Sequence, residues 1–156
     1  RISEILFSAL KEKDYYIYQK PPKSTGREYY GKYFLPEILN SFPDIDPSSI
    51  ISTITEYTSY SINFNYEMYL KKKVRIEELF VSGGGAYNPA VMDGLSKYFG
   101  KSVQIKKIES LGFSSDSKEA VCFAILANEL INGNATNVPK VTGANRQTLL
   151  GKICLP

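Results

Sequence analysis

The sequence contains no histidine at any of its 156 positions. That absence removes Ser-His-Asp and Cys-His nucleophile pairs, histidine general bases and histidine metal ligands from this chain. Any chemistry must therefore rest on carboxylates, lysine or arginine side chains, hydroxyl groups and backbone amides.

Cysteines and long apolar runs are also scarce. The two cysteines, Cys122 and Cys154, do not make a disulfide framework, and we interpret both as free thiols in a reducing compartment. No stretch approaches the roughly 20 apolar residues that a membrane-spanning helix requires, and no signal peptide opens the chain. These absences predict a soluble, cytoplasmic protein that does not bind a membrane.

Positive and negative charges nearly balance, since the net charge is only +3. The most basic run, Lys71–Arg75, follows a helical pattern, where cations complement the negative end of the helix dipole. The 12 tyrosines are spaced as the edges of an amphipathic core more than as a stacking surface for single-stranded nucleic acid. The sequence therefore predicts no nucleic-acid partner.

The first half of the sequence has the patterns of helices. A chain of this length suits one domain, since it buries about 70% of its unfolded surface. Apolar spacing predicts a helix over Ile2–Lys11 with no recognisable cap, and a helix from near Arg27 that Pro36 kinks or resets. Asp46 as N-cap and Pro47 at the first turn begin a helix of roughly 25 residues.

The second half alternates between strands and helices. Residues 75–82 and 102–108 have strand patterns, and a helix capped by Asn88 lies between them. A last helix follows within 114–133 and is apolar nearly all round from Ala120 to Ile131, which predicts that it is buried. Strand, helix, strand, helix indicates the α/β class with parallel strand pairing.

One tempting motif is rejected. Residues 94–102 resemble a phosphate-binding loop, but five residues instead of four separate Gly94 from Gly100. The order is also reversed, because that loop needs a strand before it and a helix after it. We interpret Gly100 as the C-cap of a helix.

Three consecutive glycines, Gly83 to Gly85, stand between the first predicted strand and the helix that follows. One glycine would serve a tight turn, whereas three leave a bare backbone at the carboxyl end of a strand, where α/β folds bind ligands. Outward amides at a helix start suit phosphate, although Ala86 and Asn88 break the dinucleotide pattern. A plain turn without a ligand remains the alternative.

The pair Asp116 and Glu119 also has two interpretations. Asp116 at the N-cap and Glu119 at N3 would form a capping box for the last helix. Glu119 is equally a carboxylate at a helix start that could face the same cleft as the glycines. The pattern favours the cap.

Four motifs in order now resemble a known family. "KPPKSTGREYY", "LFVSGGGAYNPAVMDGL", "GFSSDSKEAVCFAILANELINGNATNVPKVTGA" and "LLGKI" are similar to the carboxyl-terminal half of anhydro-N-acetylmuramic acid kinases, from about Pro21 to Ile153. The resemblance implies one lobe of the actin-like (ribonuclease H-like) ATPase fold, a mixed sheet flanked by helices. Residues 1–156 would form a single domain, the carboxyl-terminal lobe of a two-lobed kinase whose amino-terminal lobe is absent from this chain.

The resemblance also implies an activity. Such kinases use ATP and Mg²⁺ to cleave the 1,6-anhydro bond of anhydro-N-acetylmuramic acid and to phosphorylate its 6-oxygen during recycling of cell-wall sugars. The general base would lie in the amino-terminal lobe, so the chain alone is expected to be inactive. The alternatives are a non-catalytic ligand-binding or assembly module that kept the fold, and a kinase for another sugar.

Site residues follow from the same resemblance. It implies a homodimer as a possible assembly, and it gives this chain no metal ligand. It assigns Glu119 a catalytic role near the sugar, where it would orient groups at the reacting centre. The two binding segments it implies are a nucleotide-binding set, Gly83, Gly84, Gly85, Ala86 and Asn88, and a set contacting substrate or phosphate, Lys23, Ser24, Thr25, Gly26 and Arg27.

Overall fold

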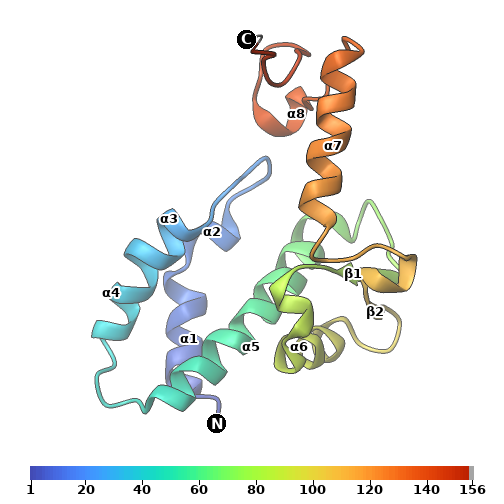
Figure 1. Ribbon diagram of the computed structural model, residues 1–156. Coiled ribbons are helices and arrows are strands. Elements are labelled where there is room, and N and C mark those ends of the chain that lie inside the picture. The colour runs from blue at the N-terminus through green and yellow to red at the C-terminus, as the bar shows by residue number, and fades with distance from the viewer. Residues whose placement is uncertain (155–156) are drawn as a thin grey trace. The chain divides into compact units, whose positions relative to one another are not determined.

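The computed structural model describes residues 1–154 (Figure 1). By their internal contacts these residues divide into two compact units, one over Arg1–Lys107 and one from Ile108 onward. The first unit is mostly helical and carries the two strands. Its elements in chain order are α1 (Glu4–Lys13), α2 (Tyr15–Tyr18), α3 (Arg27–Tyr29), the π-helical turn η1 (Tyr30–Phe34), α4 (Leu35–Asn40), α5 (Pro47–Asn65), the π-helical turn η2 (Tyr66–Leu70), β1 (Glu78–Val81), the 3₁₀ turn η3 (Gly84–Tyr87), α6 (Pro89–Phe99) and β2 (Gln104–Lys107).

Side-chain caps set the starts of the main helices. The Asp46 carboxylate accepts from the amide of Ser49 at 3.0 Å, and Pro47 opens α5 as predicted. Ser3 caps α1 in the same way, so the prediction of an uncapped first helix is wrong. Pro36 lies in the first turn of α4, where its lack of an amide hydrogen costs no helical hydrogen bond. Because α4 begins directly after the π-helical turn η1, this position fits the predicted reset of the helix.

The sheet consists of β1 and β2, which pair in parallel. Glu78 lies opposite Gln104 and Val81 opposite Lys107, with α6 as the crossover between the strands. The predicted parallel pairing is therefore confirmed. The described residues as a whole form a mostly helical structure with this one small sheet.

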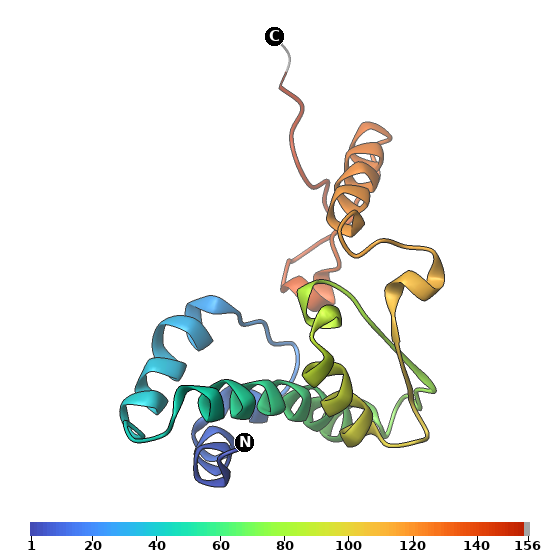
Figure 2. The same ribbon diagram turned by 60° about the horizontal axis from the view of Figure 1, so that its bottom comes forward.

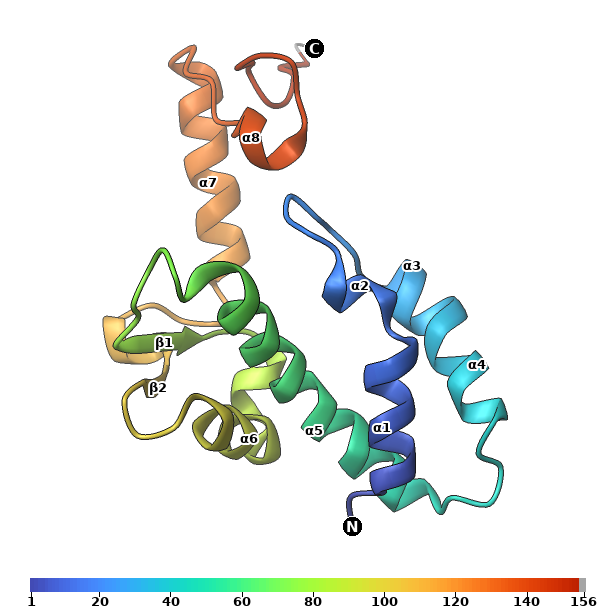
Figure 3. The same cartoon turned by 180° about the vertical axis from the view of Figure 1, so that it is seen from behind.

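Two apolar clusters hold the first unit together. Along α1 and α5, which lie side by side in Figure 3, Leu6 and Leu10 pack with Tyr57, and Ile38 joins them from α4. Around the sheet, Tyr66 packs with Val91, Leu95, Phe99 and Val103. Tyr57 and Tyr66 are both buried, which confirms that tyrosines of the long helical segment belong to the core.

Helix α6 lies close along α5 (Figure 2) because Gly94 has no side chain. A Cβ atom on Gly94 would lie 2.6 Å from the Ser59 hydroxyl oxygen and 2.8 Å from its Cβ. Ser59 is fully buried there and donates its hydroxyl to the Val91 carbonyl at 3.0 Å. A glycine on α6 and a small polar residue on α5 thus allow the two helices to approach to hydrogen-bonding distance.

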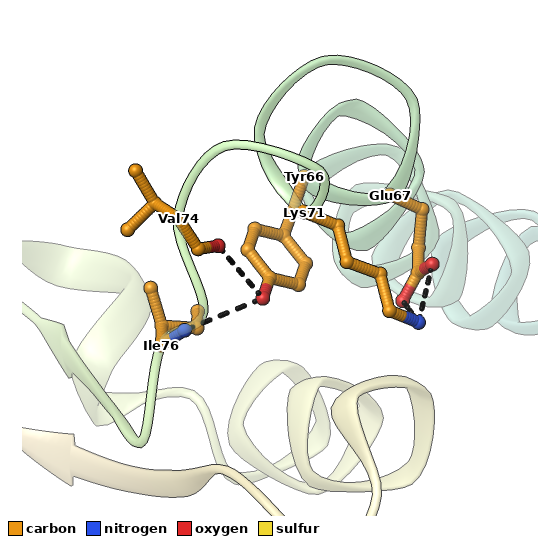
Figure 4. A network of polar contacts seen from close by, with 5 residues as sticks. All are labelled: Tyr66, Glu67, Lys71, Val74 and Ile76. Carbon is orange, nitrogen blue, oxygen red and sulfur yellow. Dashed lines mark hydrogen bonds and ion pairs between the residues drawn. The ribbon is translucent and has the colours of Figure 1, made fainter.

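The phenol of Tyr66 fixes the segment that leads into β1 (Figure 4). Its hydroxyl donates to the Val74 carbonyl at 3.3 Å and accepts from the Ile76 amide at 3.4 Å. Lys71, in the intervening turn, forms an ion pair with Glu67 one helical turn earlier, at 2.8 Å. The lysine-rich run therefore closes the long helical segment, in agreement with the interpretation of Lys71–Arg75 as a helix end.

The second unit contains the 3₁₀ turn η4 (Ile108–Leu111), α7 (Lys118–Ile131) and α8 (Pro139–Thr142). The predicted burial of the apolar helix is wrong, because no residue of α7 is buried and Phe123 is 71% exposed. Burial needs a covering surface, and the described residues of this unit offer only the turn η4, the short α8 and irregular chain. Asn137 organises that chain, donating to the Arg146 carbonyl and accepting from the Thr148 amide.

None of the helices formed by residues 1–154 combines the length and the apolar character that crossing a bilayer demands.

Candidate functional site

The glycine segment forms a turn of its own between β1 and α6. Gly83 has a φ of +81°, a region that residues with a side chain rarely adopt, and its carbonyl accepts from the Ala86 amide at 3.0 Å. The next residues form the 3₁₀ turn η3, and only then does α6 begin. A separate turn over the glycines therefore lies between the strand and the helix, as the sequence pattern indicated.

The outer side of this turn is open. Gly84 and Gly85 are exposed, and a Cβ atom built on either would meet nothing within 4 Å. Ala86, in contrast, is buried and anchors the turn to the unit. Sterics within the protein thus require a glycine at position 83 alone, and the other two glycines leave free space beside the backbone.

Asn88 joins the turn to α6. Its side-chain oxygen accepts from the Ala90 amide at 3.0 Å, which confirms Asn88 as the predicted N-cap with Pro89 after it. At the other end, Gly100 has a φ of +70° and caps α6, and strand β2 follows. The rejection of a phosphate-binding loop over residues 94–102 is therefore confirmed.

The second predicted segment borders a pocket of about 380 Å³. Lys23, Ser24 and Thr25 line it together with residues from α2, η1 and α5, which are Tyr16, Ile17, Tyr30, Ser61 and Asn65. Gly26 and Arg27 are not among the lining residues; Gly26 precedes α3, and Arg27 is its exposed first residue. None of the residues of the glycine turn lines this pocket.

The Lys23 ammonium group is held in place on one wall. It donates to the carbonyls of Tyr16 and Ile17 at 2.9 and 3.1 Å, and it lies 5.0 Å from the centre of the Tyr69 ring. Burial lowers the pKa of Lys23, while the negative charge of Asp14 works in the opposite direction. Tyr16 in turn donates its hydroxyl to the Ser24 carbonyl at 2.9 Å, which fixes the loop from the other side.

A fully buried carboxylate, Asp14, supports this pocket from behind. It accepts hydroxyl hydrogens from Tyr57 at 2.6 Å and Tyr30 at 3.0 Å, and its other oxygen accepts the Tyr16 amide at 3.0 Å. Tyr16 and Tyr30 are pocket walls, so one side chain orients two of them. Local sequence patterns do not reveal Asp14, because its partner Tyr57 is 43 positions away.

Stability at alkaline pH follows from these contacts. Burial, and then the hydrogen bond to Asp14, raises the pKa of Tyr57 well above its ordinary value of about 10. The neutral phenol is thus favoured in the folded state, and its contribution to stability is complete below pH 10 and is lost as the pH rises above that value. We expect Tyr57→Phe to flatten the fall in unfolding free energy above pH 10.

Urea unfolding at pH 8, 9, 10 and 11 measures this dependence, with Tyr33→Phe as the control on an exposed tyrosine. Equal slopes above pH 10 for wild type and Tyr57→Phe, with Tyr33→Phe also unchanged, would show that the Tyr57 phenol does not carry the effect.

Glu119 lies in the second unit, exposed in the first turn of α7. The predicted capping box is wrong, because Ser117 occupies the N-cap position and makes no side-chain cap. The Ser114 hydroxyl oxygen instead accepts from the amides of Asp116 and Ser117 at 3.2 and 3.4 Å. Glu119 therefore has no capping role, and the structural explanation that competed with a functional one is removed.

Within residues 1–154 no group of three or more Cys, Asp or Glu side chains is arranged to hold a metal ion. The backbone turn at 83–88 and the pocket at 23–25 are thus the two places in the first unit where predicted binding residues gather. They could bind a phosphate-bearing or polar organic ligand.

Comparison with known proteins shows which family this chain resembles. The sequence model of the family described as anhydro-N-acetylmuramic acid kinase matches residues 1–156. Proteins of that name from Caldanaerobacter subterraneus subsp. tengcongensis and Clostridioides difficile strain 630 are each 39% identical, over 92% and 88% of this chain. One from Bacillus cereus strain G9842 is 42% identical over 88% of it.

The chain spans 36% of the length of each of these curated relatives. It belongs to a family of sugar kinases. That family is the anhydro-N-acetylmuramic acid kinases, as the ordered motifs indicated.

Proposed function

We propose that this chain is the carboxyl-terminal lobe of an ATP-dependent kinase that cleaves the 1,6-anhydro bond of anhydro-N-acetylmuramic acid and phosphorylates its 6-oxygen. The observation that carries the proposal is the family match along the whole chain. The same membership supports the actin-like ATPase fold, of which the parallel pair β1 and β2 would be part of a larger mixed sheet.

The glycine turn supports nucleotide binding by its shape. Free space beside Gly84 and Gly85 lets a phosphate group approach the backbone, and the first amides of a helical turn have no acceptor within that turn. Gly83, Ala86 and Asn88 hold the turn rather than meet the ligand with their side chains, since Ala86 is buried and Asn88 caps α6. The turn would bind and orient the phosphates of ATP.

Mg²⁺ belongs to the proposed reaction as the ion that accompanies ATP. Residues 1–154 offer no cluster of carboxylates for it, so we derive no step through the ion within this chain. Phosphoryl transfer depends mainly on positioning and charge stabilisation. This chain would supply nucleotide orientation at the glycine turn and substrate or phosphate contacts at Lys23–Arg27, both in the first unit. Glu119, in the second unit, is a separate candidate contact.

The decisive measurement compares turnover by the full-length protein with turnover by this chain alone. In the protein carrying this chain at its full encoded length, we expect ADP release only when ATP, Mg²⁺ and the anhydro sugar are all present. The purified 156-residue chain is expected to release no ADP in the same coupled assay. Turnover by the full-length protein on another sugar alone would reassign the substrate, and turnover by the short chain would overturn its assignment as one lobe.

Substitution of Gly84 tests the turn. Its φ is not in the left-handed region and a Cβ meets open space, so Gly84→Val is expected to leave the melting temperature unchanged. ADP affinity is expected to fall by about tenfold or more, equivalent to about 1.4 kcal/mol, because the isopropyl group occupies the path of the phosphates. Gly84→Ala is the graded control with a smaller loss. Unchanged ADP affinity in Gly84→Val would remove the turn from the nucleotide site.

A further inference from the structure

A second pocket of the first unit lies at the amino end of the sheet. Its volume is about 350 Å³, within the range of roughly 300–1,000 Å³ for small-molecule sites. Residues of η2 and of the turn before β1 line it, together with residues from the end of α6 and the approach to β2. The glycine turn follows β1 at the opposite, carboxyl end, and none of residues 83–88 lines this pocket. The pocket is therefore separate from the proposed nucleotide site.

The floor of this pocket is apolar and fixed. The rings of Tyr66 and Phe99 pack with their centres 5.5 Å apart, and Ile76 and Val103 belong to the same apolar cluster. The Tyr66 hydroxyl is held by the backbone of Val74 and Ile76, as Figure 4 shows. Tyr66 and Phe99 keep 9% and 8% of their surfaces accessible, so the floor is not sealed. Such a floor suits a small aromatic or aliphatic group.

The rim of the pocket carries two cations in different states. The Lys71 ammonium group donates to both oxygens of the Glu67 carboxylate, at 2.9 and 2.8 Å, so the charges of this pair cancel (Figure 4). Arg75 is exposed and forms no hydrogen bond or ion pair with any of residues 1–154. Ser102 adds a hydroxyl group that likewise has no partner among these residues.

The helix before this turn does not account for Arg75. A cation stabilises a helix end only within the last turn, whereas η2 already ends at Leu70. Residues 71–77 and 101–103 together carry five cationic side chains and one carboxylate, that of Glu77. This excess of positive charge attracts anions to the rim.

We propose that this pocket binds a small organic oxyanion, which is a carboxylate or phosphate group attached to a ring or a short apolar body. The planar Arg75 guanidinium presents paired donors that match two oxygens of such a group. The apolar floor receives the body, and the Ser102 hydroxyl supplies a further donor. The site goes beyond the proposed function, because it shares no lining residue with the glycine turn or with the pocket at 23–25.

Calorimetric titration of the full-length protein at constant ionic strength tests this site. The probes are benzoate, acetate, phenyl phosphate, inorganic phosphate and benzyl alcohol, which separate the oxyanion from the body that carries it. We expect benzoate and phenyl phosphate to bind at least about tenfold more tightly than the other three. The tighter of these two aromatic anions identifies whether the site prefers a carboxylate or a phosphate.

Substitution of Arg75 assigns the binding to this pocket. Arg75→Gln is expected to weaken binding of both aromatic anions about tenfold, because a charge-assisted hydrogen bond is lost. The melting temperature and the ADP affinity are expected to stay unchanged. Lys72→Gln is the control matched in charge, because Lys72 belongs to the same exposed run and is not a lining residue. Its expected effect is below about twofold.

Equal losses in Arg75→Gln and Lys72→Gln would mean a general attraction by the basic run and would overturn the site. Aromatic anions that do not bind, that bind undiminished in Arg75→Gln, or that bind no better than benzyl alcohol would overturn it as well. Gly84→Val is expected to weaken ADP binding and to leave benzoate binding unchanged. ADP binding without benzoate binding would therefore sink this inference alone, and the reverse result would sink the nucleotide assignment alone.

Discussion

Gly94→Val is expected to lower the free energy of unfolding by about 3 kcal/mol, at the upper end of the range for overpacked positions. The added side chain would start with a Cβ only 2.6 Å from the Ser59 hydroxyl oxygen, so α5 and α6 must move apart. That movement would break the bond from Ser59 to the Val91 carbonyl and loosen the packing of Leu95. Urea unfolding followed by circular dichroism measures the loss.

Gly31→Ala is the control for a helical glycine without a close neighbour. Its Cβ would meet only the Arg27 Cβ, at 3.9 Å, which is ordinary contact. We expect this variant to match or exceed wild-type stability, since alanine favours helix by about 1 kcal/mol over glycine. A double variant, Gly94→Ala with Ser59→Gly, is expected to recover most of the loss of Gly94→Ala. Failure to recover would place the cost somewhere other than the Ser59 contact.

Asp14→Ala is the second large effect, with an expected loss of about 4 kcal/mol in unfolding free energy. The change leaves two tyrosine hydroxyls and one amide without their acceptor in a buried site, and each orphaned donor costs about 1–3 kcal/mol. Asp14→Asn keeps an acceptor oxygen, so its expected loss is about half as large. Thermal and urea unfolding of both variants measure the difference.

Asp44→Ala is the control on an exposed aspartate and is expected to stay within about 0.5 kcal/mol of wild type. A loss below about 1 kcal/mol for Asp14→Ala would mean that water or a rearranged side chain replaces the carboxylate.

Local signals accounted for most element starts. Asp46 with Pro47 and Asn88 with Pro89 each combine an N-cap with a proline in the first turn, and both pairs begin helices where predicted. Such signals act over a few residues and are visible in sequence. The cap of α7 was misassigned because Ser114, Asp116 and Ser117 compete at successive positions and local chemistry does not rank them.

Features that depend on distant partners could not be predicted in this way. The buried Asp14 is one of several acidic residues near a helix end, and only packing brings Tyr57 to it. The same holds for Gly94, whose role depends on Ser59 in another helix. The apolar pattern of α7 indicated burial, but a pattern describes what a helix can bury and not what covers it.

The same distinction between local signals and distant partners applies to the candidate site. The glycine turn was visible because three adjacent glycines are a local and costly choice, and Gly83 alone has the positive φ that demands one. Ser61 and Asn65 of the pocket carry no such signal, since they are ordinary polar residues on one face of α5. Their position beside Lys23 comes from the packing of α5 against α2.

Because of the contacts of the Tyr66 phenol, the turn between η2 and β1 is expected to tolerate substitutions better than insertions or deletions. Both of its hydrogen bonds go to backbone groups, at Val74 and Ile76, and so depend on no side chain in between. The three lysines at 71–73 can therefore mutate with little consequence for the entry into β1. A gained or lost residue would carry the two backbone partners away from the ring, so the entry into β1 depends more on the length of this turn than on its side chains.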